Sequence, residues 1–132
     1  MSYWNDSLLT GVALIDDEHR KLIASVDKLI DSMKQGKSKE ELSQHLNQTV
    51  SIAKEHIRVE ENLQEKHAYP GVGAHKRHHA QFSMQAGELV KEFAKTGPNV
   101  TMTAKASKTV ADWLVSHISA EDKKLGDFLN NV

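Results

Sequence analysis

Apolar residues recur every three or four positions along most of the chain, and strong helix breakers interrupt this pattern at only a few places. These breakers are Gly36, the "YPGVG" stretch at 69–73 and the "TGPN" stretch at 96–99. A repeat of this length is typical of an amphipathic α-helix with one buried face. The pattern therefore predicts four helices, over about 16–35, 38–67, 73–95 and from 100 onward, after an irregular N-terminal arm. No segment shows the alternation that a half-buried strand requires.

The helix starts and the short connections indicate how the four helices are arranged. Ser38 and Glu41 have the spacing of a capping box, and Asn99 is a plausible N-cap of the last helix. Connections of a few residues favour antiparallel neighbours. We therefore expect an all-α fold, an antiparallel up-down-up-down four-helix bundle, with residues 1–132 forming a single domain.

Composition excludes several classes of function. The 132 residues carry a formal net charge of −1, which gives no electrostatic basis for binding nucleic acid or an anionic membrane. No apolar run approaches the length of a membrane span, and the start "MSYWNDSLLTG" lacks the features of a secretory signal. Cysteine is absent, so we expect a cytoplasmic protein without disulfide or thiolate chemistry. No exposed apolar stripe is evident, so we also expect a monomer.

The eight histidines are the unusual feature of the composition, and helical periodicity sorts them. Residues four apart share a face, so His75 and His79 fall on one apolar stripe, and His56 falls beside Glu60 on another. His19 and His117 also lie on the inner faces of their helices. Glu61 is expected to turn toward solvent, as is His78. His45 is expected to be structural and His67 to pack in a turn.

A single inward histidine is more often a hydrogen-bonded core residue than a metal ligand. Here that explanation would have to hold on four helices at once. A buried Glu60 among imidazoles is also costly unless a cation neutralises it. The pattern therefore predicts a metal site inside the bundle.

The ordered set of motifs resembles the hemerythrin family in its single-domain bacterial form. The resemblance begins at Trp4 and spans nearly the whole chain, through "GVALIDDEH" (11–19), "HIRVEENL" (56–63), "YPGVGAHKRHHAQF" (69–82) and "WLVSHISAED" (113–122). It implies a non-haem centre of two iron ions. One iron would be bound by His75, His79 and His117, and the other by His19 and His56. Glu60, Asp122 and an oxo or hydroxo group would bridge them.

One implied ligand conflicts with regular helical periodicity. Four residues after His117, an unbroken helix would bring Glu121 inward and turn Asp122 away. The resemblance favours Asp122. Both can hold only if the helix bends, tightens or ends between Ile118 and Asp122, and we predict such a break. In a regular helix Glu121 would be the better candidate.

The resemblance also implies an oxygen pocket and a function. Ile23, Trp113, Leu114 and Ile118 would keep water away from the metals. Gln64 stands where a methionine is common in the family; it either contacts a ligand as an outer partner or leans toward solvent. Five neutral imidazoles with only two carboxylates favour carriage over oxidation.

The function implied is reversible dioxygen binding as a carrier, store or local buffer, with oxygen held as hydroperoxide on the five-coordinate iron. An oxygen-consuming enzyme is one candidate recipient. Zinc, copper or manganese could compete for the same ligands. The alternative is a di-iron oxidase or peroxidase, or a protein that handles nitric oxide or iron at this site. A sensor module would need a separate partner for its output.

Overall fold

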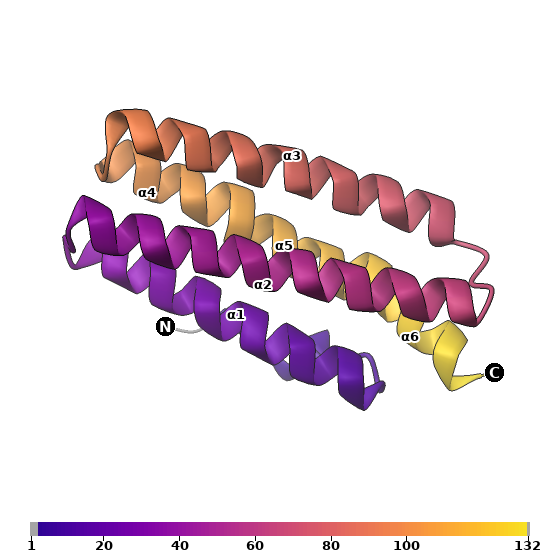
Figure 1. The fold of residues 1–132 in the computed structure, drawn as a ribbon. Helices are drawn as coiled ribbons and strands as arrows, with labels where there is room; N and C mark the ends of the chain where they lie inside the picture. Colours follow the sequence, from indigo (N-terminus) through magenta and orange to yellow (C-terminus); the bar gives the residue numbers. More distant parts are fainter. Residues whose placement is uncertain (1–2, 132) are drawn as a thin grey trace.

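The computed structural model describes residues 3–131, which form a bundle of four long helical segments (Figure 1). The first three are α1 (Ala13–Lys34), α2 (Lys39–Lys66) and α3 (Val72–Thr96). The fourth is continuous and comprises α4 (Val100–Ala106), η2 (Ser107–Asp112), α5 (Trp113–His117), η3 (Ile118–Asp122) and α6 (Lys123–Asn130). Both η2 and η3 are π-helical. Residues 3–131 contain no β-strand, so the predicted all-α class is confirmed.

The four segments pack in sequence order and close into a ring. α1 contacts α2, α2 contacts α3, and both α1 and α3 contact the α4–η2 part of the fourth segment. Successive segments run in opposite directions (Figure 1). This arrangement is the predicted antiparallel up-down-up-down bundle, in which each helix buries one face against two neighbours.

The helix boundaries follow from local capping. The Ser38 hydroxyl accepts a hydrogen bond from the Glu41 N–H at 3.2 Å, and the Asn99 side-chain oxygen accepts one from the Met102 N–H at 2.8 Å. Both satisfy backbone donors that a helix start leaves without partners. At the other ends, Gly36 and Gly97 adopt φ values of +72° and +71°, in the left-handed region that glycine enters at low cost.

The N-terminal arm is irregular, as predicted, and hydrogen bonds connect it to α1 and to α6. It contains one 3-10 turn, η1 (Asp6–Leu8), whose Leu8 is buried. The Asp16 carboxylate accepts hydrogen bonds from the Thr10 N–H and hydroxyl, each at 2.8 Å. The Asn130 amide donates to the Thr10 carbonyl at 3.1 Å. The arm therefore joins the start of α1 to α6.

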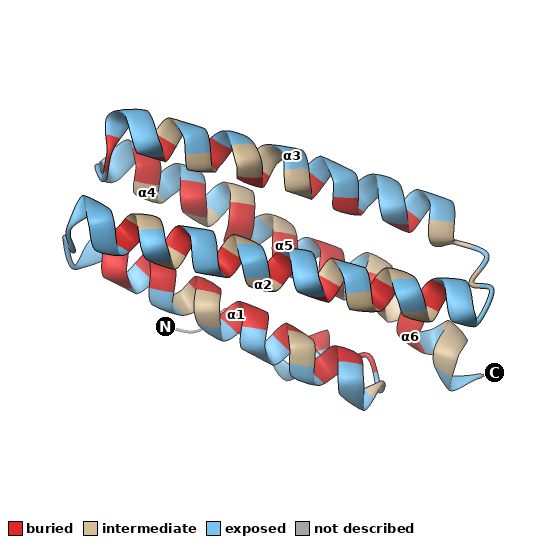
Figure 2. Cartoon of the chain, in the orientation of Figure 1, coloured by how far each residue is buried: buried red, intermediate tan, exposed pale blue. Residues whose placement is uncertain are grey.

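The buried residues follow the inward faces of the helices (Figure 2). They divide into an apolar part and a polar part. Near the α1–α2 and α3–α4 turns the core is made of apolar side chains such as Leu29, Leu42, Phe93 and Met102. Toward the α2–α3 turn, buried histidines and carboxylates replace them. Within residues 3–131 no helix combines the length and the apolar character needed to cross a lipid bilayer.

Candidate metal centre

All seven predicted ligands are buried together in the polar part of the interior, and all four helical segments contribute. Each is at most 6% exposed. Spacings of four residues place His56 beside Glu60 on α2 and His75 beside His79 on α3. The complete set is His19 (α1), His56 and Glu60 (α2), His75 and His79 (α3), His117 (α5) and Asp122 (η3).

The ligand atoms fall into two groups that share the carboxylates. Glu60, His75, His79, His117 and Asp122 form one group; His19, His56, Glu60 and Asp122 form the other. Within each group, one ligand atom per residue lies within 4.8 Å of all the others. This is the arrangement that two neighbouring cations with shared carboxylate ligands would require.

Each carboxylate directs its two oxygens to different groups. Glu60 Oε1 lies 2.7 Å from His75 Nε2, whereas Glu60 Oε2 lies 2.7 Å from His56 Nε2. Asp122 Oδ1 lies 2.8 Å from His75 Nε2, whereas Asp122 Oδ2 lies 3.0 Å from His19 Nε2. Glu60 and Asp122 therefore each place one oxygen beside each of the two histidine groups.

Several of these buried atoms lack hydrogen-bond partners despite their short separations. In the described part of the chain, no hydrogen bond satisfies Nε2 of His19, Nε2 of His56 or any carboxylate oxygen of Glu60 and Asp122. These nitrogen and oxygen atoms lie close together without hydrogen-bond geometry, so they surround a common space. Unsatisfied buried polar atoms cost free energy, and imidazole nitrogens with carboxylate oxygens are ligands that iron and zinc accept. The residues therefore fit bound cations.

The electrostatics of the metal-free cluster favour positive charge within it. Burial alone would lower the pKa of His19, but the close approach and negative charge of Asp122 and Glu60 outweigh burial and raise it from 6.5 to about 9. The pKa of His75 also rises to about 9, for the same opposing causes. Without metal the cluster holds protons tightly, so a cation that binds must displace them.

The carboxylates show the complementary effect. Burial would raise the pKa of Glu60, but its contacts with Asp122 and with the surrounding imidazoles hold that pKa well below 4.5. Burial and the neighbouring Glu60 act to raise the pKa of Asp122, yet His117 and His19 keep it below its ordinary value. Two anionic carboxylates therefore face inward, ready to hold positive charge.

The π-helical turn η3 resolves the conflict between Glu121 and Asp122. η3 spans Ile118–Asp122, and Asp122 is buried with its Oδ1 3.2 Å from His117 Nε2. Glu121 is displaced outward, with Oε1 4.0 Å from His78 Nε2 and 3.7 Å from Lys124 Nζ. The predicted irregularity is confirmed in position. The helix neither tightens nor ends there; the turn widens by about one residue and the helix continues as α6.

One acidic and one amide side chain contact the Nδ1 atoms of two predicted ligands. Glu61 Oε2 lies 2.9 Å from His79 Nδ1, and Gln64 Nε2 lies 3.0 Å from His75 Nδ1. The prediction that Glu61 turns toward solvent is therefore wrong: its side chain is only 26% exposed and is paired. A signal for this was its place at the edge of the helix face that carries Glu60. The structure buries Gln64 completely, so it does not lean toward solvent.

A small apolar cavity adjoins the ligands on one side. Its volume is about 10 Å³, near the smallest space that holds one water-sized molecule. Beside His56, His79, His117 and Asp122 it is lined by Leu22, Ala53, Ile57, Phe82, Trp113 and Leu114. Of the predicted pocket residues, Trp113 and Leu114 line it, while Ile23 and Ile118 are buried in the core beyond it. The periodicity singled out neither Leu22 nor Ile57 for this role, although Leu22 shares the apolar stripe of α1.

Trp113 also stacks on the ring of one predicted ligand, His117. Its ring lies 4.7 Å from the His117 ring with an interplanar angle of 10°, and the Phe82 ring stacks on it at 4.5 Å. Face-to-face contacts of this kind restrict ring rotation.

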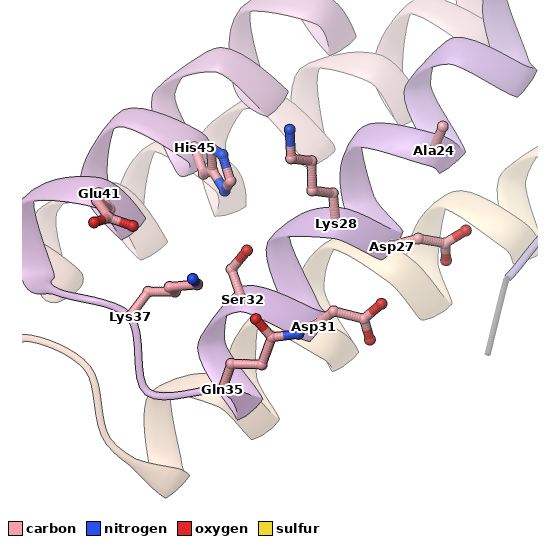
Figure 3. Close-up of a pocket in the computed structure, with 9 residues that line it drawn as sticks. All are labelled: Ala24, Asp27, Lys28, Asp31, Ser32, Gln35, Lys37, Glu41 and His45. Carbon is pink, nitrogen blue, oxygen red and sulfur yellow. The ribbon is translucent and has the colours of Figure 1, made fainter.

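A larger groove of about 650 Å³ lies elsewhere, between the C-terminal part of α1 and the N-terminal part of α2 (Figure 3). Its lining mixes Lys28 and Lys37 with Asp27, Asp31 and Glu41 and also includes His45. It shares no residue with the histidine cluster.

An antiparallel four-helix bundle with five buried imidazoles and two shared carboxylates defines a class of cation-binding helical proteins. Residues 10–129 match the family described as the hemerythrin HHE cation binding domain. The chain belongs to the hemerythrin family.

Relatives from bacteria and from an animal support this assignment over most of the chain. A bacteriohemerythrin of Methylococcus capsulatus is 30% identical over 121 residues, which cover 92% of this chain and 90% of the relative. A bacteriohemerythrin of Pseudomonas aeruginosa is 29% identical over 90% of this chain and 75% of its own length. A myohemerythrin of Theromyzon tessulatum is 25% identical over 92% of this chain and 88% of its own length.

Proposed function

We propose that this protein binds dioxygen reversibly at a pair of iron ions, as a carrier, store or local buffer. The observation that carries the proposal is the pair of carboxylates, each with one oxygen toward each histidine group. Membership of the hemerythrin family supports iron as the metal. Two ferrous ions, when bound, supply the two electrons that reversible dioxygen binding requires.

In this proposal the chain divides its ligands unequally. His75, His79 and His117 hold one iron, His19 and His56 hold the other, and Glu60 with Asp122 is shared. His19 and His56 would give their iron fewer protein ligands than the other three histidines give theirs, which would leave room for a small molecule there. The apolar cavity reaches the cluster at His56, His79, His117 and Asp122, so it supports entry of dioxygen to the centre.

The walls of the cavity suit binding without onward chemistry. Its six lining residues other than the proposed ligands carry neither a carboxyl nor an amino group. A side chain that delivered a further proton would favour irreversible oxidation, and these apolar walls also exclude water. We therefore propose a binding protein, with oxidase or peroxidase turnover only a side activity.

The test is reconstitution with ferrous iron in the absence of air, followed by cycles of oxygen addition and removal. The expected result is two irons per chain and a visible charge-transfer band that appears with oxygen and disappears without it over several cycles. A permanently ferric product, or turnover of added peroxide, would instead support the oxidase or peroxidase alternative. In a His56→Ala variant metal binding should weaken and the oxygenated spectrum should be lost; an unchanged spectrum would remove His56 from the site.

A further inference from the structure

Gln64 is a buried amide beside the centre, and only one of its two polar atoms has a hydrogen-bond partner among the described residues. It lies one turn after Glu60 on α2 and is fully buried. Its Nε2 is 3.0 Å from His75 Nδ1, while its Oε1 has no partner among the described residues. A buried amide oxygen without a partner is costly, so this contact requires an explanation.

The role of Gln64 follows from the contacts of the other ring nitrogen of His75, Nε2. His75 Nε2 faces the centre, 2.7 Å from Glu60 Oε1 and 2.8 Å from Asp122 Oδ1. To bind a cation there, Nε2 must present its lone pair, and the proton of the neutral ring then sits on Nδ1. Nδ1–H is a donor and needs an acceptor. The amide nitrogen of Gln64, also a donor, cannot serve.

A half-turn of the amide about its last bond removes the conflict between the two donors. The oxygen and nitrogen of an amide have nearly the same size, so Oε1 can take the place of Nε2 at the same distance from His75. Oε1 then accepts the Nδ1–H, the amide nitrogen takes the former place of Oε1, and the lone pair of His75 Nε2 is free for a cation held together with the shared carboxylates.

We propose that Gln64 is a positioning residue that holds His75 in its metal-binding tautomer by accepting the Nδ1–H through its amide oxygen. The inference deepens the proposed function and rests on its metal site, but not on oxygen binding. A residue that fixes the far nitrogen of a ligating histidine sets both ring orientation and ligand basicity.

The other rings show that this contact is particular to His75. His79 has an anionic acceptor, Glu61, at the partly exposed edge of the bundle. Nδ1 of His19, His56 and His117 has no hydrogen-bond partner within residues 3–131. Gln64 thus supplies a neutral acceptor where a second buried anion would add charge beside Glu60. His75 Nε2 also lies within 2.8 Å of both shared carboxylates, so its orientation affects both histidine groups.

Zinc, which has no redox chemistry, tests this proposal separately from oxygen binding. Zinc affinity is measured by competition with a chromogenic chelator for the wild type and for Gln64→Leu, Gln64→Glu and the exposed matched control Gln48→Leu on α2. We expect Gln64→Leu to weaken zinc binding by about 10- to 100-fold. Gln64→Glu retains an acceptor and should remain within a few-fold of the wild type, and Gln48→Leu should be unchanged.

A spectroscopic readout separates positioning from a merely structural role. In zinc-loaded protein with ¹⁵N-labelled histidine, His75 should carry its proton on Nδ1, and that proton should exchange slowly in the wild type and faster in Gln64→Leu. The unfolding midpoint of metal-free Gln64→Leu should fall, because the Nδ1–H of His75 loses its acceptor; the place of the His75 proton and its rescue by Gln64→Glu therefore separate positioning from stability.

Three results would overturn the inference. They are a wild type that binds no zinc, an unchanged zinc affinity in Gln64→Leu, or a zinc-loaded His75 protonated on Nε2. If zinc binding responds as expected but the iron protein fails to bind oxygen reversibly, the role of Gln64 stands and the proposed function fails.

Discussion

His117 Nε2 and Asp122 Oδ1 lie 3.2 Å apart although the two residues are five positions apart along one helical segment. In a regular α-helix, positions five apart are rotated by about 140° from one another and face different neighbours. The π-helical turn η3 adds one residue to the turn and so returns Asp122 to the face of His117. The same widening places Glu121 beside His78 and Lys124.

This relationship predicts opposite outcomes for two adjacent carboxylates. Asp122→Asn should lower the bound metal by at least one ion per chain, because Asp122 is shared between the two histidine groups. Glu121→Gln should leave the metal content unchanged and alter zinc affinity by no more than about twofold, since Glu121 lies outside both ligand groups and its ion pairs are partly exposed to solvent. Elemental analysis and chelator competition measure both. Loss of metal in Glu121→Gln alone would reverse the assignment.

The sequence predicted the helices and most of the centre because both depend on local patterns. Ser38 and Asn99 mark helix starts by a side-chain bond to a backbone N–H three residues on, and this bond needs no tertiary context. The four-residue spacing of His56 and Glu60 places them on one face of any regular α-helix.

The features that the sequence did not predict depend on contacts between helices. Ser119 and Ala120 are ordinary helix residues, and nothing in them distinguishes a π-turn from an α-turn. The turn widens where burial of both His117 and Asp122 outweighs regular backbone bonding. Glu61 sits at the edge of its helix face, so only the position of α3 decides that it meets His79.

The stability of metal-free protein should fall as the pH rises from 6.5 to 9. The pKa values of His19 and His75 are about 9 in the folded protein against 6.5 ordinarily, so folding binds protons in this range. Their stabilisation is complete below pH 6.5 and is lost as the pH passes 9. The depressed pKa values of Glu60 and Asp122 give a contribution that is lost only at acid pH, so it stays constant here.

Urea unfolding midpoints at pH 6, 7.5 and 9 measure this effect without metal. The same protonation predicts that zinc uptake at pH 7 releases protons, which an indicator dye in weak buffer detects. The zinc-loaded protein should lose less stability over this range, because the metal replaces the protons. A midpoint that is constant from pH 6 to 9 in the metal-free protein would contradict the prediction.

Gly126 should be intolerant of a methyl group because the N-terminal arm lies directly against it. A Cβ at this position would be 2.6 Å from the Thr10 carbonyl oxygen and 2.7 Å from Thr10 Cβ. Thr10 cannot move freely, since Asp16 and Asn130 both hold it. We expect Gly126→Ala to lower the free energy of unfolding by about 1–3 kcal/mol. Thermal or urea unfolding measures the loss.

Gly87 in α3 provides the matched control for this substitution. Nothing lies within 4 Å of a Cβ built there, so the added methyl meets no neighbour. Gly87→Ala should raise the free energy of unfolding by about 0.5–1 kcal/mol, because alanine loses less backbone entropy in a helix. Equal effects at the two glycines would show that the arm does not restrain α6.

Leu114 should control access of water to the centre, and Leu29 separates that effect from stability. Both leucines are buried, but Leu114 lines the cavity beside His56 and His117, whereas Leu29 lies ten residues beyond His19, about 15 Å along α1. Each substitution by alanine should cost about 2–5 kcal/mol of stability.

Only Leu114→Ala enlarges the cavity, so it alone should accelerate conversion of the oxygen-exposed ferrous protein to a permanently ferric form. An acceleration of about tenfold corresponds to about 1.4 kcal/mol in the barrier. Repeated oxygen cycles followed by visible absorption measure the rate, and equal acceleration in Leu29→Ala would assign the effect to lost stability rather than to the cavity wall.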